Sequence, residues 1–218
     1  MTSMFEDVAA VMRAQTPGRR LKGDPVDDET VLSLIELSEH AIAEHRRRCE
    51  FVVVREPEVR HQLARTYRQS WSVYKRYLRT QSHDDADLEA RQWESDHFED
   101  VPVHVVACII GRRPVFRAMG AATFYAAALP AVQNLLLAAG AKGLGASATT
   151  LPLWSSWEAR RTLGLPLRVT PVAVVALGWP RGAAAPLPTP PVGNIVHLDR
   201  FGHQPFRARP RRAGADLA

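Results

Sequence analysis

The run VPVHVVACII at residues 101–110 constrains the fold most strongly, because apolar side chains occupy almost every position in it. Successive side chains of a strand point to opposite faces of a sheet, so a run without alternation predicts a strand that is buried on both faces. The run LRVTPVAVVALGW at residues 167–179 predicts a second long strand. The chain is therefore expected to contain a sheet with a fully covered central strand.

Amphipathic helices and shorter strands are predicted around these two runs. In the N-terminal segment, for example, Phe5, Val8, Val11 and Met12 fall at helical spacing. The predicted helices span 4–15, 29–45, 55–81, 118–139 and 155–161, short strands follow at 51–54 and after Gly145, and the polar segment 82–96 is a loop with a short helix. Helices and strands do not alternate regularly, which predicts one α+β domain. We place this domain at residues 1–206, with a basic tail at 207–218.

The composition is typical of a soluble globular protein, with 46% hydrophobic and 23% charged residues in a chain of 218. Much of the net charge of +5 sits in the C-terminal tail, whose Pro, Gly and Ala residues favour a solvated tail over a nucleic-acid-binding one. Residues 118–139 are apolar but include Gly120, Pro130 and Asn134, so they predict a buried helix and not a membrane span. Because no apolar segment follows a basic N-terminus, we expect a cytoplasmic protein.

Short motifs in the sequence do not identify a nucleotide-binding or catalytic site. GLGASA at 143–148 fits a dinucleotide fingerprint, but a predicted helix precedes it and a strand follows, which is the reverse of the order that the fingerprint requires. We interpret Gly143 as a left-handed helix cap instead. Cys49 and Cys108 are interpreted as buried, unreactive thiols. His97 and Glu99 have no third ligand in register and are interpreted as a local polar cap, not a metal site.

The order of several segments resembles the nitroreductase family. The resemblance rests on GRRLKGDPVDDETVLSLIELS, FVVVREPEVRHQLA, HFEDVPVHVVACI, ALPAVQNLLLAAGAKGLGASATTL and PVAVVALGWPRG, and VGNIVHLDRFG fits the C-terminal segment of the family. It covers residues 13 to 206. The resemblance implies an α/β/α sandwich that forms an intertwined homodimer. It also implies FMN at the dimer interface, NADH or NADPH as reductant, and a flat acceptor such as a nitroaromatic or a quinone.

The same resemblance assigns the cofactor-binding residues one by one. Arg19 and Arg20 correspond to basic residues that hold the FMN phosphate in the family, although the preceding Arg and Ser positions are here Gln15, Thr16 and Pro17. A guanidinium group suits a phosphate because it donates two parallel hydrogen bonds. The Lys-x-Arg pair that also reaches the phosphate in the family is replaced by Leu187 and Thr189.

The ring of the flavin has two further predicted contacts. The family loop that hydrogen-bonds the isoalloxazine corresponds to AIAEHRR at 41–47, with His45 at the Asn position and Arg47 at the Gln position. Arg47 can donate to ring or ribityl oxygens but cannot accept from the N3–H group. Thr149, Thr150 and Leu151 correspond to the backbone edge that approaches the ring near N5. No side chain is expected to act as an acid or base, since the chemistry would take place on the flavin.

Two alternatives remain open at the level of sequence. The replaced positions are also compatible with a flavin-free dimer that acts as a binding or structural protein. They are equally compatible with a member that binds a different anionic ligand, such as a deazaflavin, through the arginine run 46–48.

Overall fold

A four-stranded antiparallel sheet with the strand order β1-β2-β4-β3 forms the core of residues 1–184. The strands are β1 (Cys49–Val54), β2 (Val103–Ile110), β3 (Gly145–Thr149) and β4 (Val169–Gly178). The two apolar runs form the central pair, β2 and β4, and both are buried almost throughout, as predicted. The computed structural model describes residues 4–15, 20–40, 49–81, 85–111, 124–182 and 189–207.

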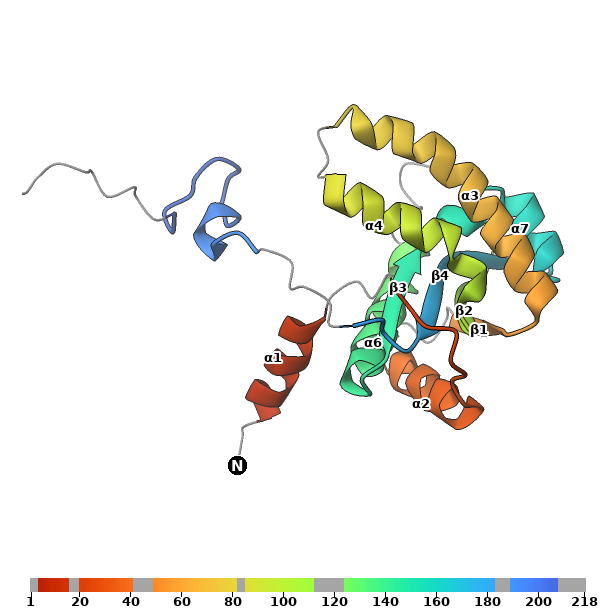
Figure 1. Ribbon diagram of the computed structural model, residues 1–218. Helices are drawn as coiled ribbons and strands as arrows, with labels where there is room; N and C mark the ends of the chain where they lie inside the picture. Colours follow the sequence, from red (N-terminus) through yellow and green to blue (C-terminus); the bar gives the residue numbers. More distant parts are fainter. Residues whose placement is uncertain are drawn as a thin grey trace, which may run out of the picture. The chain divides into compact units, whose positions relative to one another are not determined.

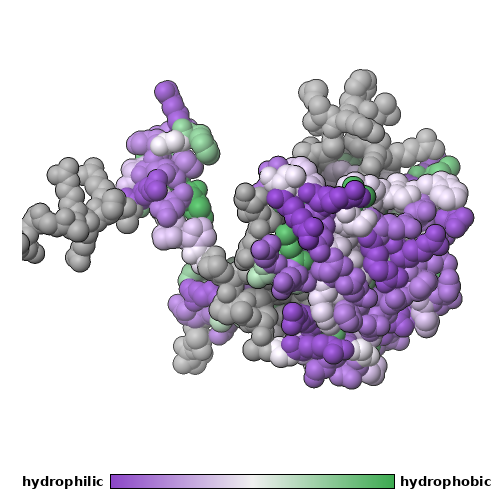
Figure 2. Space-filling view, turned by 45° about the horizontal axis from the view of Figure 1, so that its top comes forward, coloured by the Kyte–Doolittle hydropathy of each residue, from purple (hydrophilic) through white to green (hydrophobic). Residues whose placement is uncertain are grey.

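Helices cover both faces of this sheet (Figure 1). One face carries α2 (Asp28–Glu39) and α6 (Leu129–Ala141), and the other carries α3 (Pro57–Arg79), α4 (Asp85–Asp96) and α7 (Ser156–Thr162). The arrangement is the predicted α/β/α sandwich of an α+β protein. Figure 2 turns the α3–α4 side toward the viewer and shows a mostly hydrophilic surface there.

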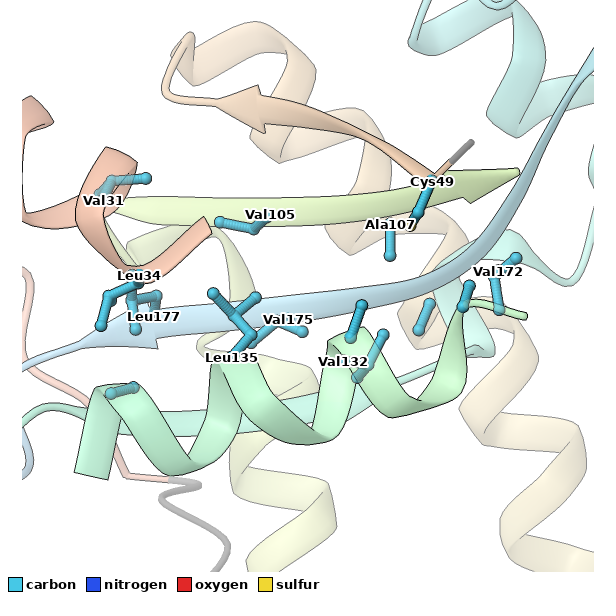
Figure 3. Packing of buried hydrophobic residues seen from close by; sticks show 14 of the residues in the cluster. Val31, Leu34, Cys49, Val105, Ala107, Val132, Leu135, Val172, Val175 and Leu177 are labelled. Carbon is cyan, nitrogen blue, oxygen red and sulfur yellow. The ribbon is translucent and has the colours of Figure 1, made fainter. Parts of the chain in front are cut away.

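Each face of the sheet has its own apolar core, because side chains alternate along the central strands. Figure 3 shows the first core, in which Leu34 from α2 and Leu135 from α6 pack against Val105, Val175 and Leu177 of the sheet. In the second core, the rings of Tyr67, Trp71, Phe98 and His104 lie beneath α3 and α4. The Tyr67 and Phe98 rings meet edge to face, with centroids 4.9 Å apart.

Several local predictions are confirmed and others require correction. Asp27 caps α2 by accepting from the Thr30 N–H at 2.7 Å, and Gly143 ends α6 with a φ of 77°. The helix predicted over 29–45 ends earlier, at Glu39, and residues 41–48 lie outside the described part of the chain. Of the helix predicted over 118–139, residues 118–123 lie outside the described part of the chain, 124–126 are helical, and α6 begins at Leu129 after a turn at 127–128.

The segment 82–96 was predicted as a loop with a short helix, but most of it is the 12-residue helix α4. Its polar composition hides the helix from periodicity, because tertiary packing stabilises it through few apolar side chains. Leu88 is buried, and the Trp71 indole N–H donates to Gln92 Oε1 at 2.9 Å.

The sequence predicts that helix α6 is buried on nearly every side. In the single chain, however, only one side of α6 is buried. Ala131, Val132, Leu135 and Ala139 are buried, whereas Leu129 is half-exposed. Within the described residues, one helical stretch, Phe124–Ala141, is long and apolar enough by composition to cross a membrane, a test that core helices also pass.

Two further segments precede and follow the residues that form this core. Helix α1 (Met4–Ala14) has no buried residue, and Gln133 donates to Gln15 just after it at 2.8 Å. Residues 185–218 form a separate compact unit with η3 (Val192–Asn194), in which the His197 ring stacks on Phe201. The extent of the domain, 1–206, stays a prediction.

Candidate functional site

The end of β3 exposes polypeptide backbone at the edge of the sheet. β3 pairs only with β4 among the described strands, so its other edge is free of a neighbouring strand. The chain then turns at Thr150 into η2 (Leu151–Leu153), where the Leu153 N–H donates to the Thr150 carbonyl at 3.0 Å. Thr150 is exposed and the Leu151 side chain is buried. Free backbone donors and acceptors at such an edge can bind the polar rim of a flat ligand.

Ser70 of α3 bonds to the backbone at the end of this edge. Its side chain is buried, and its hydroxyl lies 2.9 Å from the Leu151 carbonyl oxygen, to which it can donate. The carbonyl of Thr66, one turn earlier in α3, is an alternative acceptor at 2.8 Å. Helix α3 therefore holds the start of η2 in place through a side chain–backbone bond.

We expect Ser70→Ala to lower the free energy of unfolding by about 0.5–1.5 kcal/mol, because the Leu151 carbonyl loses the Ser70 hydroxyl and keeps only the Trp154 N–H as a donor. Urea unfolding followed by circular dichroism measures this change. Ser72→Ala is the matched control, since Ser72 is an exposed serine of the same helix that bonds only back to the Gln69 carbonyl. Equal stability of the two variants would contradict the anchoring role of Ser70.

A cavity of about 470 Å³ opens next to Thr150. Its inner wall consists of buried side chains, and Leu129 and Trp154 stand exposed at its rim. The described lining residues are Tyr125, Leu129, Thr150, Leu153, Trp154, Pro171 and Val172. None of them carries a charge, and two are aromatic. A cavity of this kind suits a flat, uncharged ring.

The opposite end of β3 is closed by the segment around Arg20. Leu21 bridges Pro180, and its side chain covers Gly145, where an added Cβ would lie 2.5 Å from the Leu21 side chain. Arg181 donates to this segment twice, from its N–H to the Arg20 carbonyl at 2.8 Å and from Nε to the Leu21 carbonyl at 3.0 Å. A larger residue at position 145 would therefore have to displace the end of the Leu21 side chain.

The guanidinium groups of Arg20 and Arg181 both lie over the ring of Trp93, at 6.0 Å and 5.8 Å from its centroid. This site is separated from Thr149 by the length of β3, about 13 Å for four residues at the usual rise. Arg20 is therefore held against α4 in the structure, at the other end of β3 from the cavity.

The structure brings together some predicted site residues and not others. Thr149, Thr150 and Leu151 follow one another at the end of β3 and Thr150 lines the cavity, whereas Arg20 faces Trp93. Arg19, His45 and Arg47 lie outside the described residues. All seven assignments stay predictions. Sequence reasoning missed Trp154 and Ser70; an aromatic residue directly after the turn that follows a glycine-rich strand was the available signal for Trp154.

The other polar candidates have structural roles. Burial raises the pKa of Cys49 to about 11 and that of Cys108 to about 12, so both thiols stay protonated and unreactive, as predicted. The two side chains belong to cores on opposite faces of the sheet. Glu99 binds His61 at 2.5 Å, and the His97 ring stacks on Trp93. No group of three metal-ligating side chains occurs among the described residues.

Comparison with known proteins places this fold. Residues 13–179 match the model of the nitroreductase family. A nitroreductase-type protein from Desulfovibrio desulfuricans, solved in complex with FMN, is 22% identical, with a TM-score of 0.66 over 92% of this chain and 99% of that one. An NADPH:FMN oxidoreductase from Vibrio harveyi, complexed with NAD+, is 19% identical, with a TM-score of 0.67 over 89% of this chain and 78% of that one.

An NADH dehydrogenase/NAD(P)H nitroreductase-type protein from Parabacteroides distasonis is 20% identical, with a TM-score of 0.66 over 89% of this chain and 99% of that one. All three likenesses extend over 89–92% of this chain. Together with the match over residues 13–179, they lead to one conclusion: the chain belongs to the nitroreductase family.

Proposed function

We propose that the protein is a flavin-dependent oxidoreductase that uses NADH or NADPH to reduce a flat acceptor such as a nitroaromatic or a quinone. The observation that carries this proposal is the open backbone edge at Thr149–Leu151 beside an uncharged cavity. The relatives from D. desulfuricans and V. harveyi, with FMN and NAD+ bound respectively, support it.

The described residues fit the ring half of FMN. The backbone of Thr149–Leu151 would hold the polar rim of the ring, and the cavity walls would exclude water from it. His45 and Arg47 would donate to the ring or ribityl oxygens, and Arg19 with Arg20 would bind the phosphate. When bound, FMN supplies hydride transfer at its ring, while the protein supplies orientation and electrostatics.

The phosphate half fits less well, because Arg20 is held over Trp93 and two basic family positions are Leu187 and Thr189. Each missing charge-assisted hydrogen bond weakens binding by about 1.5–3 kcal/mol. We therefore expect FMN to bind, but with lower affinity than a complete set of phosphate ligands would give.

Incubation with excess FMN followed by gel filtration tests the proposal. Yellow protein with flavin absorbance that coelutes supports it. Protein that emerges colourless at every FMN concentration would overturn the proposal. It would favour a second candidate, a flavin-free member of the family. The replaced phosphate positions and the contact of Arg20 with Trp93 support this second candidate. The same titration with a deazaflavin phosphate tests for a different anionic ligand.

The protein is also proposed to be a homodimer. A single chain leaves the apolar side of α1 uncovered, with Met4, Phe5, Val8 and Met12 between 49% and 83% exposed. Apolar surface of this kind is stabilised by burial at about 25 cal/mol per Å². Light scattering should give twice the 24.2 kDa of one chain, and Phe5→Glu should shift the population toward the single chain. A wild-type protein that remains at 24.2 kDa at high concentration would contradict this prediction.

A further inference from the structure

Trp154 is the largest side chain at the mouth of the cavity, and most of it is exposed in the single chain. Its indole is 61% exposed, whereas its backbone is fixed because its N–H donates to the Leu151 carbonyl at 3.1 Å. An exposed tryptophan adds little to folding, because only a small part of its surface is removed from water. Its rigid ring at the rim is instead placed to contact whatever enters from solvent.

The described walls of the cavity contain no charged group that could pair with an ionic ligand. Their polar side-chain groups are the hydroxyls of Tyr125 and Thr150 and the indole N–H of Trp154, and the rest is aliphatic or aromatic surface. A sulfonate or carboxylate transferred into such surroundings loses its hydration and meets only neutral donors, with no cation among the described lining residues. A flat neutral ring loses little hydration and gains stacking with the aromatic side chains.

The net charge of the whole chain works in the opposite direction. At +5, the protein attracts anions from solution. A preference for neutral acceptors therefore cannot come from the net charge. It would have to come from the side chains of the cavity and its rim.

We propose that Trp154 is a specificity-determining residue that selects uncharged planar aromatic acceptors and rejects anionic ones of the same shape. The inference rests on the proposed function, since it concerns the acceptor of the same site. It predicts that the ring of the acceptor contacts the Trp154 indole and that the described lining residues contribute no cationic anchor for the acceptor.

The test compares menadione with naphthoquinone sulfonate, two quinones of similar shape that differ in charge. Steady-state kcat/KM is measured for both on FMN-loaded protein, and their binding to flavin-free protein is measured by calorimetry. The variants are Trp154→Ala, Trp154→Phe and Trp154→Arg. Trp157→Ala is the matched control, because Trp157 is 66% exposed, lies three residues further on and is not part of the cavity lining.

We expect the wild type to favour menadione by at least about tenfold and Trp154→Ala to lose about three- to tenfold in its binding, which corresponds to one aromatic contact. Trp154→Phe should restore most of this loss, and Trp154→Arg should shift the preference toward the sulfonate. Trp157→Ala should leave both quinones unchanged.

The inference is overturned if the two quinones bind wild type equally, or if the Trp154 variants keep the wild-type ratio. These outcomes are separable from failure of the proposed function. If no FMN binds, the function fails, while calorimetry on the flavin-free protein still decides whether menadione binding depends on Trp154. If FMN binds and quinones are reduced without dependence on Trp154, the function stands and the inference does not.

Discussion

The wild type is expected to lose about 2 kcal/mol of folding stability between pH 7.5 and pH 5, and replacing His104 with leucine should abolish this loss. His104 lies in β2 and is fully buried, with its ring 4.2 Å from that of Phe98. Among the described residues, neither of its ring nitrogens has a hydrogen-bond partner. A charged imidazole would therefore have no compensation in this place.

Burial, followed by the positive charge of Arg60, lowers the pKa of His104 from 6.5 to about 3. The backbone of Phe98 opposes this shift weakly without meeting hydrogen-bond geometry. The unfolded chain binds the proton below pH 6.5, while the folded chain does not bind it until about pH 3. Stability is complete above pH 6.5 and falls by up to about 1.4 kcal/mol for each pH unit below it.

Urea unfolding at a series of pH values measures this slope. The interval from pH 6.5 to pH 5 isolates His104 from the carboxylates. The backbone N–H of Thr30 lowers the pKa of Asp27; for Glu99, burial acts to raise the pKa, but His61 and Arg68 outweigh it and the net pKa is lowered. Both carboxylates contribute stability that is lost only as the pH falls through these lowered values.

His40→Gln is the control, because His40 is exposed and gains no burial on folding. It should keep the wild-type slope, and His104→Leu should flatten it. A His104→Leu variant that is as acid-sensitive as the wild type would show that other groups cause the loss. At pH 7.5 the variant should be at least as stable as wild type, because an unpaired buried polar ring is replaced by an apolar side chain of similar volume.

The central strands and the caps could be predicted from sequence because their signals are local. β2 and β4 are continuous apolar runs, and Asp27 and Gly143 are residues that end helices by known geometry. α4 was underestimated because its stability comes from contacts with α3, such as that between Trp71 and Gln92, and not from its own apolar pattern. Periodicity reports a helix only where burial is repeated along one face.

The site was less predictable because it is assembled from residues far apart in sequence. Ser70 bonds to Leu151, which lies 81 residues away in sequence. Trp154 and Tyr125 line the same cavity, and no local sequence pattern encodes it. The resemblance assigned the backbone edge at Thr149–Leu151 to the flavin ring, and in the structure Thr150 of this edge lines a cavity. It assigned Arg20 to the phosphate from its position in a motif. In the structure the Arg20 guanidinium lies 6.0 Å from the centroid of the Trp93 ring, over 70 residues away in sequence.

The second large effect is expected for Trp71→Ala, which should lower the free energy of unfolding by about 3–5 kcal/mol. Trp71 is 2% exposed and fills the space between α3 and α4, so its removal leaves a cavity and also deprives Gln92 of a donor. Thermal and urea unfolding measure the loss. Trp71→Phe is the matched variant, because it keeps a ring but not the N–H; a smaller loss, of about 1–2 kcal/mol, would assign most of the effect to packing.

Because Ser70 precedes Trp71 on the same buried stretch of α3, the Trp71→Ala variant should also loosen the hold of α3 on Leu151. Under conditions where the variant is still folded, FMN binding should therefore be weaker than in wild type, and weaker than in Trp71→Phe. Full FMN affinity in a folded Trp71→Ala variant would show that the edge at Thr149–Leu151 keeps its geometry without support from α3. In that case the ring site would depend on the sheet alone, since β3 is held directly by β4.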